Sequence, residues 1–147
     1  MWKYVRVTAA IVAMTIVSGC ALKPDRAPVP VEAVRSIEGV KWILTGFGDH
    51  RIKAPEKAWI ELKDGRYVGF AGCNSLSGRY ERCGHELRFV REDPHTMIAC
   101  KDIDKDTLFR KRLREVNRYD IHDGMLVMEK GKERVLLFLP ASSISIR

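Results

Sequence analysis

Apolar and polar residues alternate along several short stretches of this chain, as they do in strands with one buried face. Two such stretches, 58–63 and 66–72, flank Asp64-Gly65. An Asp-Gly pair in this position indicates a β-hairpin with a two-residue turn. On the face assigned to the core, Gly69 and Ala71 are small, so we expect a large group to pack over them. The predicted cross-strand pairs are Leu62–Tyr67, Ile60–Gly69 and Trp59–Phe70.

The same pattern predicts two more hairpins, which turn at Cys83-Gly84 and at Asp123-Gly124. Further strands are expected at 41–47 and at 135–139, and Pro140 ends the last one because proline cannot donate a main-chain hydrogen bond. The predicted pairs are Tyr80–Leu87 in the first of these hairpins, and Ile121–Leu126 and Tyr119–Met128 in the second.

One segment, 105–117, shows the period of an amphipathic helix. We expect Asp104 or Asp106 to cap its first turn. One helix after five strands and before three more predicts an α+β fold. Its sheet would be antiparallel, strongly curved and barrel-like, with about eight strands, and the helix would close it. The apolar stripe comprises Leu108, Phe109, Leu113 and Val116, and the polar faces carry Arg110, Lys111 and Arg114.

The first residues predict export. Residues 7–17 form an apolar run behind a short cationic start, and they are too few to span a bilayer, which takes roughly 20 residues. The run ends in Val17-Ser18-Gly19-Cys20, which resembles a bacterial lipobox. We expect cleavage between Gly19 and Cys20 and a lipid on the Cys20 thiol. The alternative is an ordinary cleaved signal peptide whose cysteine is incidental. Ala21 in place of aspartate indicates the outer membrane, with the domain in the periplasm or at the cell surface.

The chain divides into four parts: a signal peptide at 1–19, a tether at 20–36, a folded domain at 37–140 and a tail at 141–147. The tether holds Pro24, Pro28 and Pro30, which are incompatible with a helix interior or a paired strand, so it is expected to be extended. The 128 residues from Cys20 onward suffice for one domain with its own core.

The charge is basic, with a formal net charge of +7. Removal of the signal peptide takes away two cations and no acid, which leaves +5 for the mature chain. In an exported, anchored protein this charge does not indicate nucleic acid as a partner. It fits anionic lipid, anionic polysaccharide or, most simply, a solvated basic face.

Two groups of residues raise the possibility of a metal site. Asp102, Asp104 and Asp106 have the opening spacing of a calcium loop, but Thr107 and Leu113 stand where such a loop needs glycine and glutamate. We therefore interpret these carboxylates as helix caps. The second group has the spacing of no compact zinc module, so we expect no metal and no cofactor. It comprises Cys73, Cys83, His85 and Cys100.

No catalytic arrangement is evident, and we predict that the protein is not an enzyme. Ser75 and Ser77 have no histidine in an obvious partner segment. Gly69-x-x-Gly72 is not followed by a helix, which excludes a phosphate-binding loop. Asn74 is expected to bond a turn rather than a ligand. The histidines, at loops or strand ends, are His50, His85, His95 and His122.

An ordered set of short motifs resembles the META domain of HslJ-like proteins, often exported lipoproteins linked to heat shock or envelope stress. The resemblance implies one small domain over about 37–140, with a curved antiparallel sheet and one helix. The fold is similar to that of lipid-binding pilotins, and the family brings no agreed catalytic residues. The motifs are Gly72-Cys73-Asn74, Ser77-Gly78-x-Tyr80, Thr96-Met97-x-x-Cys100 and, upstream, Gly39-x-x-Trp42-x-Leu44.

The resemblance also bears on the cysteines, which tend to pair in an oxidising envelope. Cys73 and Cys100 both lie in signature segments, which favours a disulfide between them and leaves Cys83 as a free thiol. A Cys73–Cys83 pair is the alternative. Cys83 and the charged residues 91–95 are the two departures from the family pattern.

Two functions remain, both for a lipoprotein that supports envelope integrity under stress. In the first, the domain binds an acyl chain or a peptide in an apolar groove, for which Gly69 and Ala71 leave room. In the second, the domain has a filled core and acts through its surface, as a chaperone-like or structural partner of other envelope proteins. The basic helix face motivates this second hypothesis.

Overall fold

The computed structural model describes residues 36–52, 57–94 and 98–144, apart from the side chain of Arg91. The predicted signal peptide, the lipidation site Cys20 and most of the tether lie outside these ranges, as do His95 and the signature residues Thr96 and Met97. No helix within the described ranges is long and apolar enough to cross a membrane.

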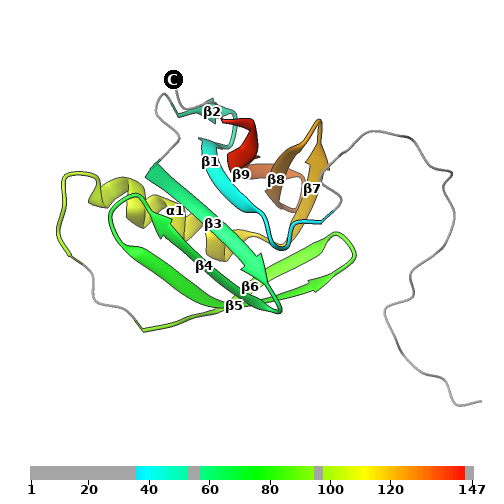
Figure 1. The fold of residues 1–147 in the computed structure, drawn as a ribbon, viewed down its shortest axis with the longest axis horizontal. Coiled ribbons are helices and arrows are strands. Elements are labelled where there is room, and N and C mark those ends of the chain that lie inside the picture. Colours follow the sequence, from blue (N-terminus) through cyan, green and yellow to red (C-terminus); the bar gives the residue numbers. More distant parts are fainter. Residues whose placement is uncertain (1–35, 53–56, 95–97, 145–147) are drawn as a thin grey trace, which may run out of the picture.

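The described residues form one antiparallel sheet of nine strands that closes on itself (Figure 1). Each strand pairs with its neighbour along the chain, except that β3 pairs with β1, and β1–β9 pairing closes the barrel. The strands are β1 (Lys41–Phe47), β2 (His50–Arg51), β3 (Ala58–Lys63), β4 (Arg66–Ala71), β5 (Ser75–Cys83), β6 (Glu86–Glu92), β7 (Arg118–His122), β8 (Met125–Lys130) and β9 (Glu133–Pro140). Because β2 is a two-residue flap on β1, eight strands make the barrel, which confirms the predicted fold class.

The two Asp-Gly hairpins have the predicted registers. Asp64 and Gly65 have φ of 50° and 74°, and Asp123 and Gly124 have φ of 51° and 75°. A two-residue turn with positive φ at both positions has a backbone twist that matches that of the flanking strands, and Asp-Gly is favoured in such a turn. The confirmed pairs are Leu62–Tyr67, Ile60–Gly69, Trp59–Phe70, Ile121–Leu126 and Tyr119–Met128.

The hairpin between β5 and β6 turns one residue later than predicted. Gly84 and His85 form the turn, so Tyr80 pairs with Phe89 rather than with Leu87. Gly84 has φ of 56° at the first turn position, which glycine favours. The partner shifts by two residues, and since strand side chains alternate, Leu87 and Tyr80 still face the interior.

Large apolar side chains fill the barrel. Trp42, Phe109 and Phe138 are fully buried, and the rings of the last two lie 6.1 Å apart. The helix α1 (Ile103–Glu115) contributes Phe109 and packs against β4, β6 and β9, so it closes the barrel as predicted (Figure 1). The indole of Trp42 donates a hydrogen bond of 2.9 Å to the carbonyl of Ile37, which satisfies its polar group.

Three predictions about the helix are wrong. It begins and ends two residues before the predicted 105–117. Leu108, assigned to the apolar stripe, is exposed, whereas Arg110, assigned to solvent, is buried. Neither Asp104 nor Asp106 caps the helix, because Asp102 holds the N-cap position without a side-chain cap bond. The buried face of the helix therefore includes the polar pair Asp106 and Arg110 as well as apolar residues, because positions 106, 109, 110 and 113 share a face at helical spacing.

Candidate functional site: a polar junction between helix and sheet

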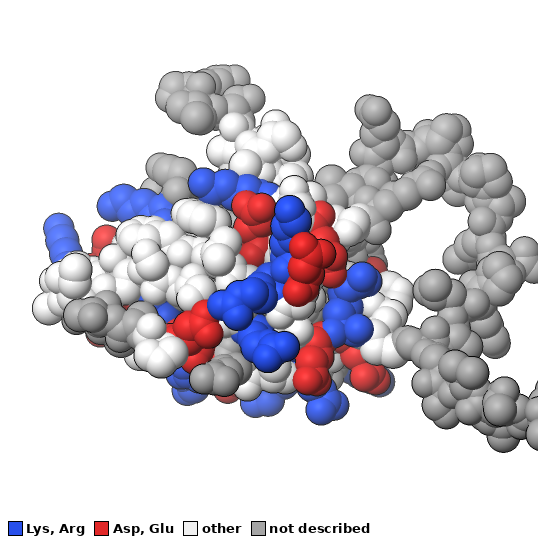
Figure 2. Space-filling model, turned by 60° about the horizontal axis from the view of Figure 1, so that its bottom comes forward, with Lys and Arg blue, Asp and Glu red and all other residues white. Residues whose placement is uncertain are grey.

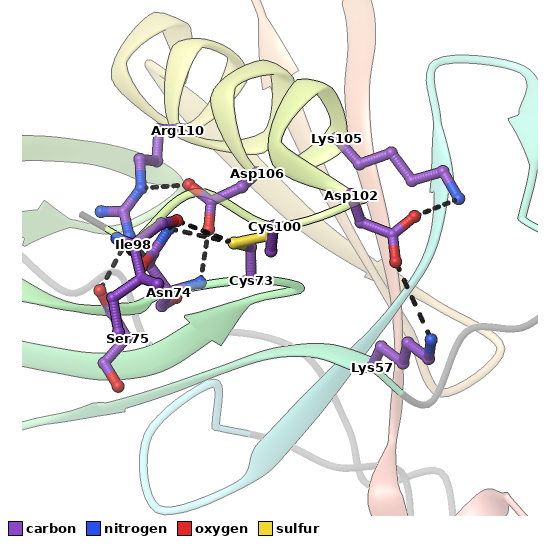
Figure 3. The surroundings of a disulfide bond; sticks show 10 residues. All are labelled: Lys57, Cys73, Asn74, Ser75, Ile98, Cys100, Asp102, Lys105, Asp106 and Arg110. Atoms are coloured by element: carbon purple, nitrogen blue, oxygen red, sulfur yellow. Dashed lines mark hydrogen bonds and ion pairs between the residues drawn. A yellow bond between two sulfur atoms is a disulfide. The ribbon is translucent and has the colours of Figure 1, made fainter.

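Four signature residues meet where the β4–β5 connection lies against the chain that leads into α1: Gly72, Cys73, Asn74 and Cys100. Cys73 lies in that connection, Cys100 lies just before the helix, and a disulfide joins them across a Cα–Cα distance of 6.2 Å (Figure 3). Gly72 has φ of 105°, a backbone conformation that suits glycine. No cysteine in the described ranges is free, so the expected free thiol at Cys83 is wrong.

Asn74 clamps the chain before the helix. Its side-chain oxygen accepts a hydrogen bond of 2.8 Å from the Ile98 amide, and its side-chain nitrogen donates one of 3.2 Å to the Ile98 carbonyl (Figure 3). The carboxamide thus pairs with both main-chain groups of Ile98, as a neighbouring strand would. Asn74 therefore bonds a segment 24 residues away rather than only its own turn.

Asp106 and Arg110 form a buried ion pair that ties α1 to the same connection. Asp106 accepts a 2.7 Å hydrogen bond from the Asn74 amide and another of 2.7 Å from Nε of Arg110. Arg110 also donates to the Ser75 carbonyl at 2.7 Å and to Glu92. Buried charges need paired and hydrogen-bonded partners, and this pair has them. We call Cys73, Asn74, Glu92, Ile98, Cys100, Asp106 and Arg110 the junction.

Weaker ion pairs surround the junction. Asp102 lies 3.8 Å from Nζ of Lys57 and 3.3 Å from Nζ of Lys105 (Figure 3). Arg114 lies 3.3 Å from Glu92. The three cations are well exposed, so solvent screens these pairs and each contributes about 1 kcal/mol or less.

The signature residues Gly78 and Tyr80 lie along β5. The Tyr80 hydroxyl donates a 2.6 Å hydrogen bond to Glu38. Burial is the main cause that raises the pKa of Tyr80 to about 12, and the hydrogen bond to Glu38 is the second. Gly78 pairs with Tyr67. Burial, and after it the nearby Glu92, raises the pKa of Tyr67 to about 12. Tyr80 thus anchors the segment that holds Glu38, and Gly78 pairs with Glu92 of the junction on its other side.

The junction is not arranged for acid–base or metal chemistry. Its two carboxylates are held by arginine, and within the described residues no group of three or more His, Cys, Asp or Glu side chains could hold a metal ion. Ser77 donates to Asp93 at 3.0 Å. Within the described ranges His85 and His122 lie beside Asp120 at the hairpin ends, and no serine is bonded to them.

The described interior leaves little space for a ligand. A hypothetical Cβ on Gly69 would lie 2.3 Å from the Trp59 carbonyl oxygen, so the main chain of β3 fills the place where a large group was expected. The crevice between α1 and the sheet measures about 70 Å³. Its lining includes Tyr67, Phe89 and Leu113. A drug-sized ligand needs a cavity of about 300–1,000 Å³, so this crevice holds none.

Larger hollows lie open on the surface. One of about 740 Å³ lies between the β1–β2 hairpin and α1, with Phe47 and Leu108 beside Arg112 and Arg134. Another of about 610 Å³ is lined by Arg88, Arg118 and Lys132 among acidic neighbours. Neither involves the junction.

Comparison with known proteins gives one family and a set of similar folds. The META domain model matches residues 35–143. No curated protein matches. A protein from Burkholderia xenovorans solved by NMR has a TM-score of 0.55 at 18% identity, over 83% of this chain and 99% of that one. A DUF4847 family protein from Bacteroides vulgatus, solved by crystallography, has a TM-score of 0.52 at 15% identity, over 70% and 93%. At such identities the likeness concerns the fold alone.

Proposed function

The chain belongs to the META domain family, and we propose that it is a non-catalytic lipoprotein of the outer membrane that supports the envelope under stress through contacts of its surface. The lipobox-like Val17-Ser18-Gly19-Cys20 supports the anchor. The surface hypothesis is favoured over an acyl- or peptide-binding groove, and one observation carries this choice: side chains and main chain fill the described interior.

The junction supports a specific contact surface. Ile98 is 69% exposed, although it is apolar. Its main chain is bonded on both sides by Asn74, and the disulfide fixes Cys100 two residues further on. An exposed apolar side chain on a fixed backbone loses little conformational entropy when a partner covers it. We assign the segment from Ile98 to Cys100 as the contact point for an envelope protein.

The contact is tested by complementation of a strain that lacks the protein, under detergent and heat stress. Ile98→Asp places a charge in the contact and is expected to abolish rescue and to remove co-purifying cross-linked proteins. Val90→Asp is the matched control, because Val90 is also exposed, at 50%, but is outside the junction. Equal rescue by both variants, with unchanged cross-links, would contradict the contact.

The anchor is tested separately by labelling with radioactive palmitate and by membrane fractionation. The wild-type chain is expected to carry label and to sediment with the outer membrane. Cys20→Ala is expected to lose the label and to accumulate with its signal peptide uncleaved. Label on the Cys20→Ala variant would exclude the lipobox assignment.

Native mass spectrometry distinguishes the surface hypothesis from its competitor. The protein without its lipid, purified after export, is expected to show only its own mass. A co-purified adduct with the mass of a fatty acid or phospholipid would restore the groove hypothesis, since it would require the core to open.

A further inference from the structure

A row of cations crosses the outer face of the sheet. Lys63 pairs with Arg66, Arg66 with Arg79, and Arg79 with Arg91, so one row on four adjacent strands, β3 to β6, carries only positive residues. The side chains of the first three are exposed. We call Lys63, Arg66 and Arg79 the cation row.

This arrangement opposes the stability of the sheet. Directly opposite residues in antiparallel strands have Cβ atoms about 4.5–5.5 Å apart, and like charges at that spacing are destabilising. Asp93 lies 2.6 Å from Arg66 and compensates one charge. Lys63 and Arg79 form no ion pair with any described side chain. The row therefore keeps a positive potential that an external anion would relieve.

Apolar side chains lie beside the row on the same face. Val68 follows Arg66 at the next outward position of β4 and is 47% exposed, and the half-buried Phe70 comes after it, opposite Trp59. Figure 2 shows the face formed by the lower strands of Figure 1. Lysine and arginine side chains gather near its middle, acidic ones flank them, and a broad uncharged area lies to one side.

We infer that this outer face docks on a bilayer that contains anionic phospholipid. The row spans two strand spacings, roughly 10 Å at about 4.8 Å each, which is wider than one phosphate group. None of the hollows described above is lined by its residues, so it is an open surface rather than a pocket. A leaflet offers many phosphates in one plane, and a neighbouring apolar area suits its interface.

The inference goes beyond the proposed lipid anchor, because it gives the domain a second contact with the membrane. It rests on the anchor only for the location in the cell. The 17 residues of the tether, at about 3.1 Å each when extended, give roughly 50 Å of reach, enough for the domain to lie on the leaflet that holds its lipid. The two contacts are separable, because vesicle binding is measured without the lipid.

The experiment is vesicle flotation of the mature chain from residue 21 onward, purified after export, which has neither the apolar signal peptide nor a site for the lipid. Vesicles of phosphatidylcholine with about one third phosphatidylglycerol are compared with pure phosphatidylcholine at low and high salt. Binding is expected only to the anionic vesicles and is expected to decrease with salt, since screening shortens the range of exposed charges. Absence of binding to the anionic vesicles at low salt overturns the inference.

Paired charge reversals locate the contact. Each cation near an anionic leaflet strengthens binding about fivefold, so Lys63→Glu with Arg79→Glu is expected to weaken vesicle partitioning by at least about 25-fold. Lys111→Glu with Arg134→Glu is the matched control, because it makes the same change in net charge at exposed cations outside the row. The milder pair Lys63→Gln with Arg79→Gln guards against loss of folding and should give an intermediate decrease. Equal losses in the row and control variants, or row-dependent binding of soluble polyphosphate without vesicle binding, would exclude the bilayer as the partner.

Discussion

The β8–β9–β1 side of the barrel and the Asp106–Arg110 pair of the junction are both buried, yet different forces hold them together. On the first side the inward side chains are apolar, among them Trp42, Leu126 and Phe138, all at 0% exposure. At the junction Asp106 and Arg110 are exposed by 0% and 4%, and they are charged. Apolar burial is non-directional and supplies most of the folding free energy. Ionic hydrogen bonds contribute less net free energy but have strict geometry.

The two regions therefore have different tasks. Strands β8, β9 and β1 are joined by continuous ladders, so their positions are fixed by main-chain pairing and need only a filled core. Helix α1 and the segment before it belong to no ladder. The directed hydrogen bonds of Asn74, Asp106 and Arg110, together with the disulfide, fix the position of the helix relative to the sheet, as main-chain pairing fixes strands relative to one another. This difference can be tested by damaging each region in turn.

The largest loss is expected from truncation in the apolar region. Trp42→Ala removes a fully buried indole together with its hydrogen bond to Ile37, and we expect it to lower the free energy of unfolding by about 5 kcal/mol. Urea denaturation monitored by circular dichroism measures the change. Trp42→Phe keeps most of the apolar volume and should cost clearly less. A similar loss in both variants would show that the hydrogen bond, rather than packing, dominates there.

The next largest loss is expected from half of the buried ion pair. Arg110→Met leaves Asp106 buried without its main charged partner, and we expect a loss of about 4 kcal/mol. Asp106→Leu combined with Arg110→Met removes the unpaired charge and should be more stable than Arg110→Met alone, as measured by urea denaturation. If the double variant instead lost the sum of the two single losses, the pair would not act as a unit.

Loss of the disulfide should have a smaller and more local effect. Cys73→Ser with Cys100→Ser removes a link between positions 27 residues apart, which is expected to lower the free energy of unfolding by about 3 kcal/mol. Hydrogen exchange distinguishes a local effect at the junction from a global loss of stability. The Ile98 amide, which is bonded to Asn74, should lose more protection against exchange than global unfolding explains. The protection of the Phe138 amide in β9 should decrease only as far as the global free energy of unfolding decreases. Equal acceleration at both amides would contradict a local role for the junction.

Local patterns predicted two of the hairpins well. The Asp64-Gly65 and Asp123-Gly124 turns have a conformation that these residues favour, so the registers of both hairpins followed from four residues. The turn after β5 was less determined. Cys83-Gly84 and Gly84-His85 both place glycine in a two-residue turn, and the pattern of inward residues is the same for both. Side-chain alternation cannot distinguish registers that differ by two residues.

The junction was hidden because its partners are distant in the sequence. The partners of Arg110 include Glu92 and Ser75, and nothing in a helical period says that an arginine has such neighbours. The period does contain a signal: positions 106 and 110 flank Phe109 on the buried face and are spaced four residues apart, as in a helical ion pair. Assigning charges to solvent by default concealed it. The resemblance drew attention to Asn74, but only the fold shows that it binds Ile98.

The smallest predicted effect concerns pH. Burial and the bond to Glu38 raise the pKa of Tyr80 from 10.0 to about 12 in the folded state. A raised folded pKa contributes stability that is complete below the unfolded value of about 10 and is lost as the pH rises through about 12. Tyr67 has a similarly raised pKa, so both tyrosines act in this alkaline window.

Urea denaturation from pH 8 to 12 should show that the free energy of unfolding decreases above pH 10, and that it decreases less steeply in Tyr80→Phe. Trp42→Phe should keep the full alkaline decrease, because it changes core packing without removing an ionisable group. Parallel decreases for the wild type and Tyr80→Phe would assign the alkaline sensitivity to other groups.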